Sequence, residues 1–137
     1  MESRESPMYV NHEENVRYYR SDGSAPCDCA YCRNYVARIE AAYPEVCGRL
    51  RLMDVDPLRP FELFLPFERE DGRLEYPVCQ YIVFGNCEDF YEYNLDGMIF
   101  EKALSHPCTQ IEGKEHFVMD FGPVLLEAFP DEKVLSQ

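Results

Sequence analysis

The sequence predicts an α+β domain: an antiparallel sheet of about five or six strands, with one helical pair, at about residues 28–53, packed on one face. Three observations favour this class. Apolar residues recur at helical spacing before residue 53, extended apolar runs follow residue 59, and two Asp-Gly pairs lie between such runs. Because 137 residues is the length of one domain, we expect residues 1–137 to form a single domain with frayed ends at 1–8 and 130–137.

The first predicted element is a strand at residues 16–20. This segment contains Val16, Tyr18 and Tyr19, which are residue types that suit strands. The polar segment 21–24 contains Ser, Asp and Gly and predicts a turn directly after it.

A helix is predicted after this turn. Apolar side chains recur there with the i, i+3, i+4, i+7 spacing of one helix face, at Cys32, Tyr35, Val36, Ile39 and Tyr43. Ser24 or Asp28 is expected to cap the helix start, with Pro26 in the first turn. Pro44 interrupts the pattern, which resumes until Asp56-Pro57 and so predicts a second, shorter helix.

Two hairpins in series are predicted for the strand-rich half. Runs 61–67 and 78–84 flank Asp71-Gly72, and runs 90–93 and 98–103 flank Asp96-Gly97. Asp-Gly between apolar runs is a strong hairpin signal. Residues 117–121 and 124–126 predict one last strand, bent at Gly122-Pro123.

The net charge of the chain limits the classes of partner that it can bind. The formal net charge is −13, and residues 60–137 contribute most of it, with 16 acidic and 5 basic side chains. Such a charge repels nucleic-acid phosphates and anionic lipid, so no nucleic-acid or membrane partner is expected. The chain has no secretory signal and no apolar run of about 20 residues, which predicts a cytoplasmic protein with reduced thiols.

Three cysteines within six residues form the most unusual local pattern. Cys27, Cys29 and Cys32 can, as thiolates, provide three corners of a tetrahedral zinc site. The fourth ligand is unknown, with candidates at Cys47, Cys79, Cys87, Cys108, His12, His106 and His116. The alternatives are that Cys32 is a core residue on the helix face, or that the Cys29 to Cys32 spacing serves redox chemistry.

Other constellations are weaker. His106 lies beside Ser105 and Cys108, which leaves open a small thiol- or metal-dependent hydrolase working there or from the cysteine segment. The acidic residues lack the spacing of a calcium loop, and the glycines do not form a phosphate-binding loop. Strand aromatics form either an ordinary core or a binding face ringed by carboxylates: Tyr76, Tyr81, Phe84, Phe90, Tyr91 and Tyr93.

The segment Pro26-Cys-Asp-Cys-Ala-Tyr-Cys-Arg-Asn-Tyr35, together with segments 57–63, 79–85 and 116–123, resembles a small group of bacterial cytoplasmic proteins to which no activity is assigned. The resemblance spans most of the chain. It implies a bacterial, single-domain protein and carries over no catalytic residue.

From the residues themselves, we predict a non-enzymatic binding protein that engages a basic protein through its acidic, strand-rich half. A structural zinc site at the cysteine segment is the alternative, and it is compatible with the first hypothesis. The hydrolase is the third.

Overall fold

The computed structural model describes residues 8–128. Their elements, in chain order, are β1 (Met8–Val10), α1 (His12–Tyr19), the 3₁₀ helix η2 (Asp22–Ser24), α2 (Ala30–Ala42), α3 (Pro44–Leu52), β2 (Glu62–Leu63), β3 (Phe67–Glu68), β4 (Leu74–Tyr76), β5 (Cys79–Cys87), β6 (Glu92–Leu95), β7 (Met98–Lys102), β8 (His116–Phe121) and β9 (Val124–Leu126). The frayed ends predicted at 1–8 and 130–137 lie outside the described residues, except for Met8, with which β1 begins.

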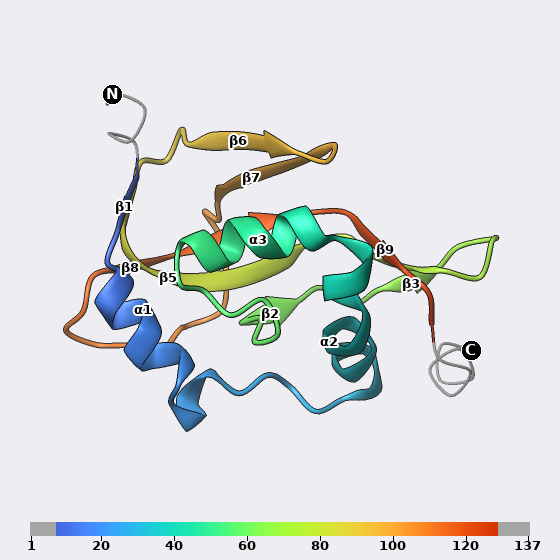
Figure 1. Cartoon of the computed structure of the whole chain (residues 1–137), viewed down its shortest axis with the longest axis horizontal. Helices are drawn as coiled ribbons and strands as arrows, with labels where there is room; N and C mark the ends of the chain where they lie inside the picture. Colours follow the sequence, from blue (N-terminus) through green and yellow to red (C-terminus); the bar gives the residue numbers. More distant parts are fainter. Residues whose placement is uncertain (1–7, 129–137) are drawn as a thin grey trace.

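Six strands form the main antiparallel sheet, in the order β1-β5-β8-β7-β6 with β2 also paired to β5. β5 is the central strand. It pairs with β8 along one edge, while β1 and β2 pair with the two ends of its other edge. The helices α2 and α3 cover one face of the sheet (Figure 1). The structure therefore confirms the predicted α+β class, the antiparallel sheet and the helical pair.

The helical pair and the sheet bury a common core. Tyr35 and Ile39 of α2, Leu50 of α3 and Tyr81 of β5 are all 0% exposed and belong to one apolar cluster. The Tyr81 hydroxyl donates to the Pro57 carbonyl at 2.7 Å and accepts from the Tyr35 hydroxyl at 2.7 Å. Because every buried hydroxyl in this chain of contacts has a partner, the hydrogen bonds offset the cost of removing these tyrosine hydroxyls from water.

The predicted strand at residues 16–20 is wrong, because most of this segment belongs to helix α1. The Asn11 side chain caps the helix by accepting from the Glu14 backbone N–H at 3.1 Å. Glu13 and Glu14 lie in the first turn, and Arg17 pairs with Glu14 three residues away. This cap, the favourable charges and the ion pair outweigh the strand preference of the short tyrosine-rich segment.

α1 covers the edge of β5 that lies between β1 and β2. The buried Asn15 side chain accepts from the Phe84 backbone N–H at 2.8 Å and donates to the Met53 carbonyl at 2.9 Å. The Tyr19 hydroxyl donates to the Ile82 carbonyl at 2.5 Å. Helix side chains thus satisfy backbone groups that a neighbouring strand would otherwise pair.

The two Asp-Gly pairs have different outcomes. Asp96-Gly97 joins β6 to β7, as predicted, and both residues have the positive φ that this hairpin turn requires. Asp71-Gly72 also closes a hairpin, but between β3 and β4 and not between the predicted runs 61–67 and 78–84. The predicted runs 61–67 and 78–84 do pair with each other, because β2 lies in the first run and pairs antiparallel with the start of β5 in the second. The β3-β4 hairpin lies between them in the chain.

The predicted bend at Gly122-Pro123 is confirmed, and it moves the chain from one sheet to another. β8 belongs to the main sheet, whereas β9 pairs with β4 in a small sheet of order β3-β4-β9. The main sheet's other face carries a smaller buried cluster of Ile82, Phe84, Ala103 and Val118. Among the described residues, none of the helices has the length and apolar character needed to cross a bilayer.

Candidate metal centre

The three cysteines singled out by their spacing come together in space. The Sγ atoms of Cys27, Cys29 and Cys32 all lie within 4.8 Å of one another. In a tetrahedral site with Zn–S bonds of about 2.3 Å, the sulfur atoms are about 3.8 Å apart. A contraction of up to about 1 Å therefore brings the thiolates to metal-binding distance. The cluster can hold a metal ion.

A turn that leads into α2 positions the sulfur atoms. Cys29 is the N-cap residue of α2, and its Sγ accepts from the Cys32 backbone N–H at 3.5 Å. The Cys27 Sγ accepts from the Cys29 backbone N–H at 3.4 Å. The unpaired N–H groups of a helix N-terminus favour negative charge, so this location suits thiolates.

The caps predicted from the sequence are wrong. Neither Ser24 nor Asp28 caps α2, and Pro26 precedes the helix instead of lying in its first turn. Ser24 ends the separate 3₁₀ helix, where its hydroxyl donates to the Ser21 carbonyl at 2.9 Å. A cysteine takes the capping position because the chain turns into the helix at Cys29, a role seldom filled by sulfur.

The start of α2 is held against the small sheet. The Tyr76 hydroxyl, on β4, donates to the Tyr31 carbonyl at 2.7 Å and accepts from the Asn34 side chain at 3.4 Å. Asn34 also donates to the Glu127 carbonyl at 3.0 Å. Tyr76 and Asn34 are both 0% exposed. The cysteine turn therefore sits on a helix end that buried hydrogen bonds fix in place.

The environment shifts the pKa values of two of the thiols in opposite directions. Burial raises the pKa of Cys32, and the hydrogen bond to Cys29 and the charge on that residue raise it further. Burial also acts to raise the pKa of Cys29, but hydrogen bonds from the Cys32 backbone N–H and the neighbouring thiols outweigh it and lower the pKa. Without metal, the cluster thus favours one thiolate, at Cys29, over several adjacent ones.

No fourth thiol, imidazole or carboxylate joins the cluster within residues 8–128. Three of the candidates, Cys47, Cys79 and Cys87, are buried in the main core, where burial raises their pKa values to about 11, 12 and 11. Among the described residues, therefore, the protein supplies three ligands and leaves the fourth position open.

The hydrogen bonds of the three histidines bear on the hydrolase alternative. They are hydrogen-bonded elsewhere: His12 to Asp54, His106 to the Pro107 carbonyl, and His116 to Thr109 and the Lys114 carbonyl. A thiol enzyme needs a base within hydrogen-bond reach of its nucleophile. In the part of the chain that the structure describes, no histidine is hydrogen-bonded to a cysteine, so the hydrolase alternative gains no support.

The strand aromatics do not form one exposed binding face. Tyr76, Tyr81, Phe84 and Tyr91 are buried, which matches the core alternative. Phe90 and Tyr93 are exposed, and they line a pocket between β1, the end of α3 and the start of β6.

A row of carboxylates crosses the main sheet on the face opposite the helices, a feature that the sequence did not single out. The strand register places Glu62, Gln80, Asp120, Glu101 and Glu92 side by side on five neighbouring strands. Burial raises the pKa of Asp120, the charge on Glu101 raises it further, and a hydrogen bond from Gln80 opposes both. Only the register could reveal this row, because its members are far apart in sequence.

Comparison of the chain with known proteins gives no guide to the role of the cluster. No family model, curated protein or solved structure matches the chain. What the cysteines can do therefore has to follow from their own chemistry and surroundings.

Proposed function

We propose that this chain is a zinc-binding domain in which Cys27, Cys29 and Cys32 hold the ion and the fourth coordination position stays exchangeable. The observation that carries the proposal is the convergence of three Sγ atoms within 4.8 Å at the start of a helix. Thiolates are soft ligands that select Zn²⁺ over Mg²⁺ or Ca²⁺. Three neighbouring thiolates would repel one another without a metal. Zinc would relieve this repulsion, because its double positive charge compensates the negative charges that form when the thiols lose their protons.

The open position distinguishes this site from a purely structural one. Structural zinc sites are closed by four protein ligands, whereas sites with three ligands keep a place for water or another molecule. Cys27 and Cys29 are exposed, which supports a fourth position that solvent can reach. A small thiol, water or a side chain of a second protein can complete it. All seven cysteines are free thiols, which fits the reducing cytoplasm that we propose as the compartment.

Metal analysis of the purified chain tests this proposal. Native mass spectrometry of protein prepared without added metal should show about one zinc per chain, and chelation should lower the melting temperature. Cys27→Ser and Cys32→Ser should lose the zinc. Cys108→Ser is the matched control, because Cys108, like Cys27, is exposed but lies outside the cluster.

A chain that carries no zinc and takes up none on titration would overturn the proposal. So would zinc that remains at full stoichiometry in both cluster variants. Circular dichroism of each variant shows whether a loss of metal comes from a loss of fold.

A second candidate function is docking of a basic protein on the carboxylate row. Glu62, Glu101 and Glu92 are exposed, and no cation lies between them in the register. Like charges directly opposite each other on a sheet are destabilising, so a cationic partner would relieve a repulsion that exists without it. The uncompensated charge of the row therefore supports a basic partner, which the negative charge would also attract during its approach.

Retention on an immobilised lysine-rich peptide tests the second candidate. Glu92→Gln with Glu101→Gln should elute at lower salt than the parent chain. Glu45→Gln with Glu112→Gln removes the same charge elsewhere on the surface and is the control. Equal elution of the two double variants would show that net charge, and not the row, determines binding.

A further inference from the structure

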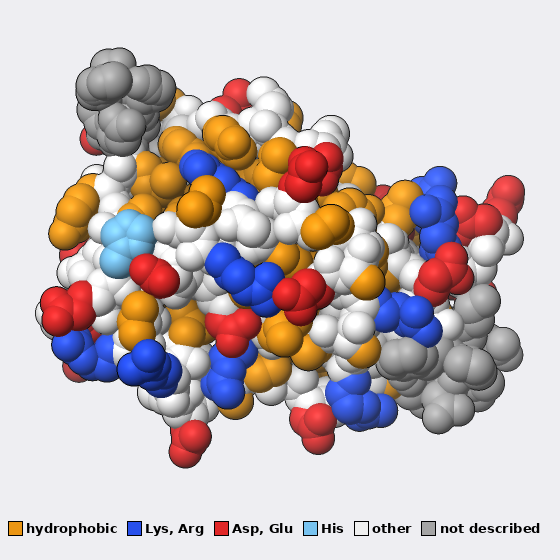
Figure 2. Space-filling model, in the orientation of Figure 1, with side chains coloured by type: hydrophobic (Ala, Val, Ile, Leu, Met, Phe, Trp, Pro, Cys, Tyr) orange, Lys and Arg blue, Asp and Glu red, His pale blue; other side chains and the backbone are white. Residues whose placement is uncertain are grey.

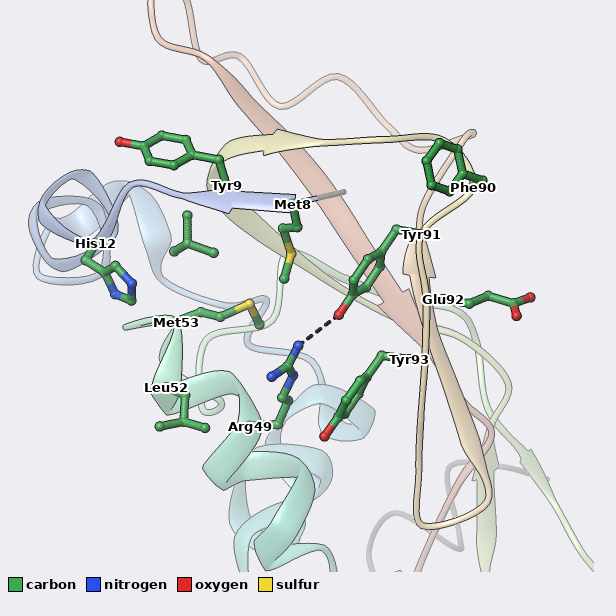
Figure 3. A pocket seen from close by; sticks show the side chains of 11 residues that line it. Met8, Tyr9, His12, Arg49, Leu52, Met53, Phe90, Tyr91, Glu92 and Tyr93 are labelled. Carbon is green, nitrogen blue, oxygen red and sulfur yellow. Dashed lines mark hydrogen bonds between the residues drawn. The ribbon is translucent and has the colours of Figure 1, made fainter. Parts of the chain in front are cut away.

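A pocket of about 780 Å³ opens between β1, the end of α3 and the start of β6 (Figure 3). Pockets that bind small molecules commonly measure about 300–1,000 Å³. Its walls include Met8, Leu52, Met53 and Phe90, of which Leu52 and Phe90 are 71% and 73% exposed. Figure 2 shows that hydrophobic side chains gather over the region between α3 and β6. An exposed apolar concavity of this kind indicates a binding site.

One cation lies inside this apolar surface. The Arg49 guanidinium donates to the Tyr91 hydroxyl at 2.8 Å and stacks over the Tyr93 ring at 4.0 Å from its centroid. Arg51, on the same helix, is paired with Glu40 at 2.6 Å. Within residues 8–128, by contrast, no carboxylate forms a salt bridge with Arg49. In a chain with a net charge of −13, a cation that is held by the Tyr91 hydroxyl and the Tyr93 ring and has no acid partner among the described residues is a strong indication of an anionic ligand.

The polar groups beside Arg49 are donors. A guanidinium has five N–H groups, and the contact with Tyr91 uses one of them. Because the Tyr91 oxygen accepts that bond, its own O–H remains available to donate. Two acids lie nearby. The Glu92 side chain, which also lines the pocket, points away from Arg49 (Figure 3), and Asp54 is hydrogen-bonded to His12. A planar guanidinium with adjacent hydroxyls matches the two oxygens of a carboxylate.

We propose that this pocket binds a small organic carboxylate with an apolar body. The carboxylate pairs with Arg49 and accepts from the Tyr91 hydroxyl, and the apolar body lies against Met8, Met53 and Phe90. The ring of Tyr93 holds the guanidinium in place, so little side-chain entropy is lost on binding. The site is separate from the cysteine cluster, which lies at the start of α2, and it does not depend on the zinc proposal.

Isothermal titration with dodecanoate and dodecan-1-ol, below their aggregation limits, tests the assignment. The two probes share the apolar body and differ in the carboxylate. Dodecanoate should bind the parent chain, and the alcohol should bind at least about tenfold more weakly. Arg49→Gln should weaken dodecanoate binding by about tenfold to a hundredfold, because it removes charge-assisted hydrogen bonds. Arg51→Gln is the matched control and should bind as the parent does.

Several results would overturn the proposal: no binding of dodecanoate, equal binding of the alcohol, or equal affinity in Arg49→Gln and Arg51→Gln. A dimer of the parent chain that Phe90→Ser converts to monomer would identify a second copy as the occupant and would also refute it. Tyr91→Phe keeps the ring and should weaken binding less than Arg49→Gln, which keeps the test meaningful if the arginine variant is unstable. Cys27→Ser should bind dodecanoate normally, so failure of either proposal is recognised separately.

Discussion

The pH dependence of zinc affinity follows from the thiol chemistry of the cluster. Zinc binds thiolates, so every thiol that is protonated before binding releases its proton. The raised pKa of Cys32 keeps that thiol protonated at neutral pH, whereas the lowered pKa of Cys29 means that its proton is lost first as pH rises. Binding near pH 6.5 should therefore release about two to three protons, because thiols of ordinary pKa are protonated there.

The magnitude follows from this proton count. Each proton released makes the apparent affinity rise tenfold per pH unit, which is about 1.4 kcal/mol. The apparent zinc association constant should thus rise by about two to three powers of ten between pH 6 and pH 7. The slope should then fall by one at higher pH, when Cys29 is already ionised, while the raised pKa of Cys32 still leaves a proton to displace from that thiol.

Competition with a chelator of known affinity, at closely spaced pH values, measures this slope. Titration calorimetry in buffers of different ionisation enthalpy counts the protons independently. A slope below one power of ten per pH unit would refute the assignment of thiol ligands. A slope of one throughout the range would mean that only one of the three cysteines binds the metal.

Two further predictions concern the sheet. Asn15→Ala should lower the free energy of unfolding by about 2–6 kcal/mol, since the Phe84 N–H and the Met53 carbonyl each lose a buried partner worth about 1–3 kcal/mol. Chemical denaturation measures this change, and a loss below about 1 kcal/mol would mean that water replaces the side chain. Glu101→Gln should lower the pKa of Asp120. Because a raised carboxyl pKa costs stability above that pKa, the variant should also be more stable by up to about 1 kcal/mol near pH 7. An unchanged Asp120 pKa in a carboxyl-carbon NMR titration would leave burial as its only cause.

The fold class could be predicted because its signals are local. The apolar spacing from Cys32 to Tyr43 reports one helix face, and Asp96-Gly97 reports one turn, without knowledge of the rest of the chain. The prediction of a strand at 16–20 was wrong because other local signals outweighed residue preference. Its tyrosines suited a strand, but the cap at Asn11 and the charge pair of Glu14 with Arg17 decide the element. The Asn-x-x-Glu pattern at 11–14 was the readable signal for a helix start.

The two proposed sites also differ in whether local sequence could reveal them. Three cysteines within six residues predict their own proximity, because a short turn cannot separate them far. The absence of a fourth described ligand could not be predicted, since it depends on which distant thiols the core buries. Arg49 and Tyr91 lie 42 residues apart, and no local pattern connects an arginine on α3 with a tyrosine beside β6. Only the packing of the helical pair on the sheet brings them together.

That packing also explains how one small chain can support two sites. Cys29 lies at the start of α2 and Arg49 near the end of α3, so the two proposed sites are at opposite ends of the helical pair (Figure 1). Between them the helices bury Tyr35, Ile39 and Leu50 completely. A close-packed interior of this kind gives both ends a firm base. Both proposed sites therefore lie at the exposed ends of the helical pair, and the buried core fixes the helices between them.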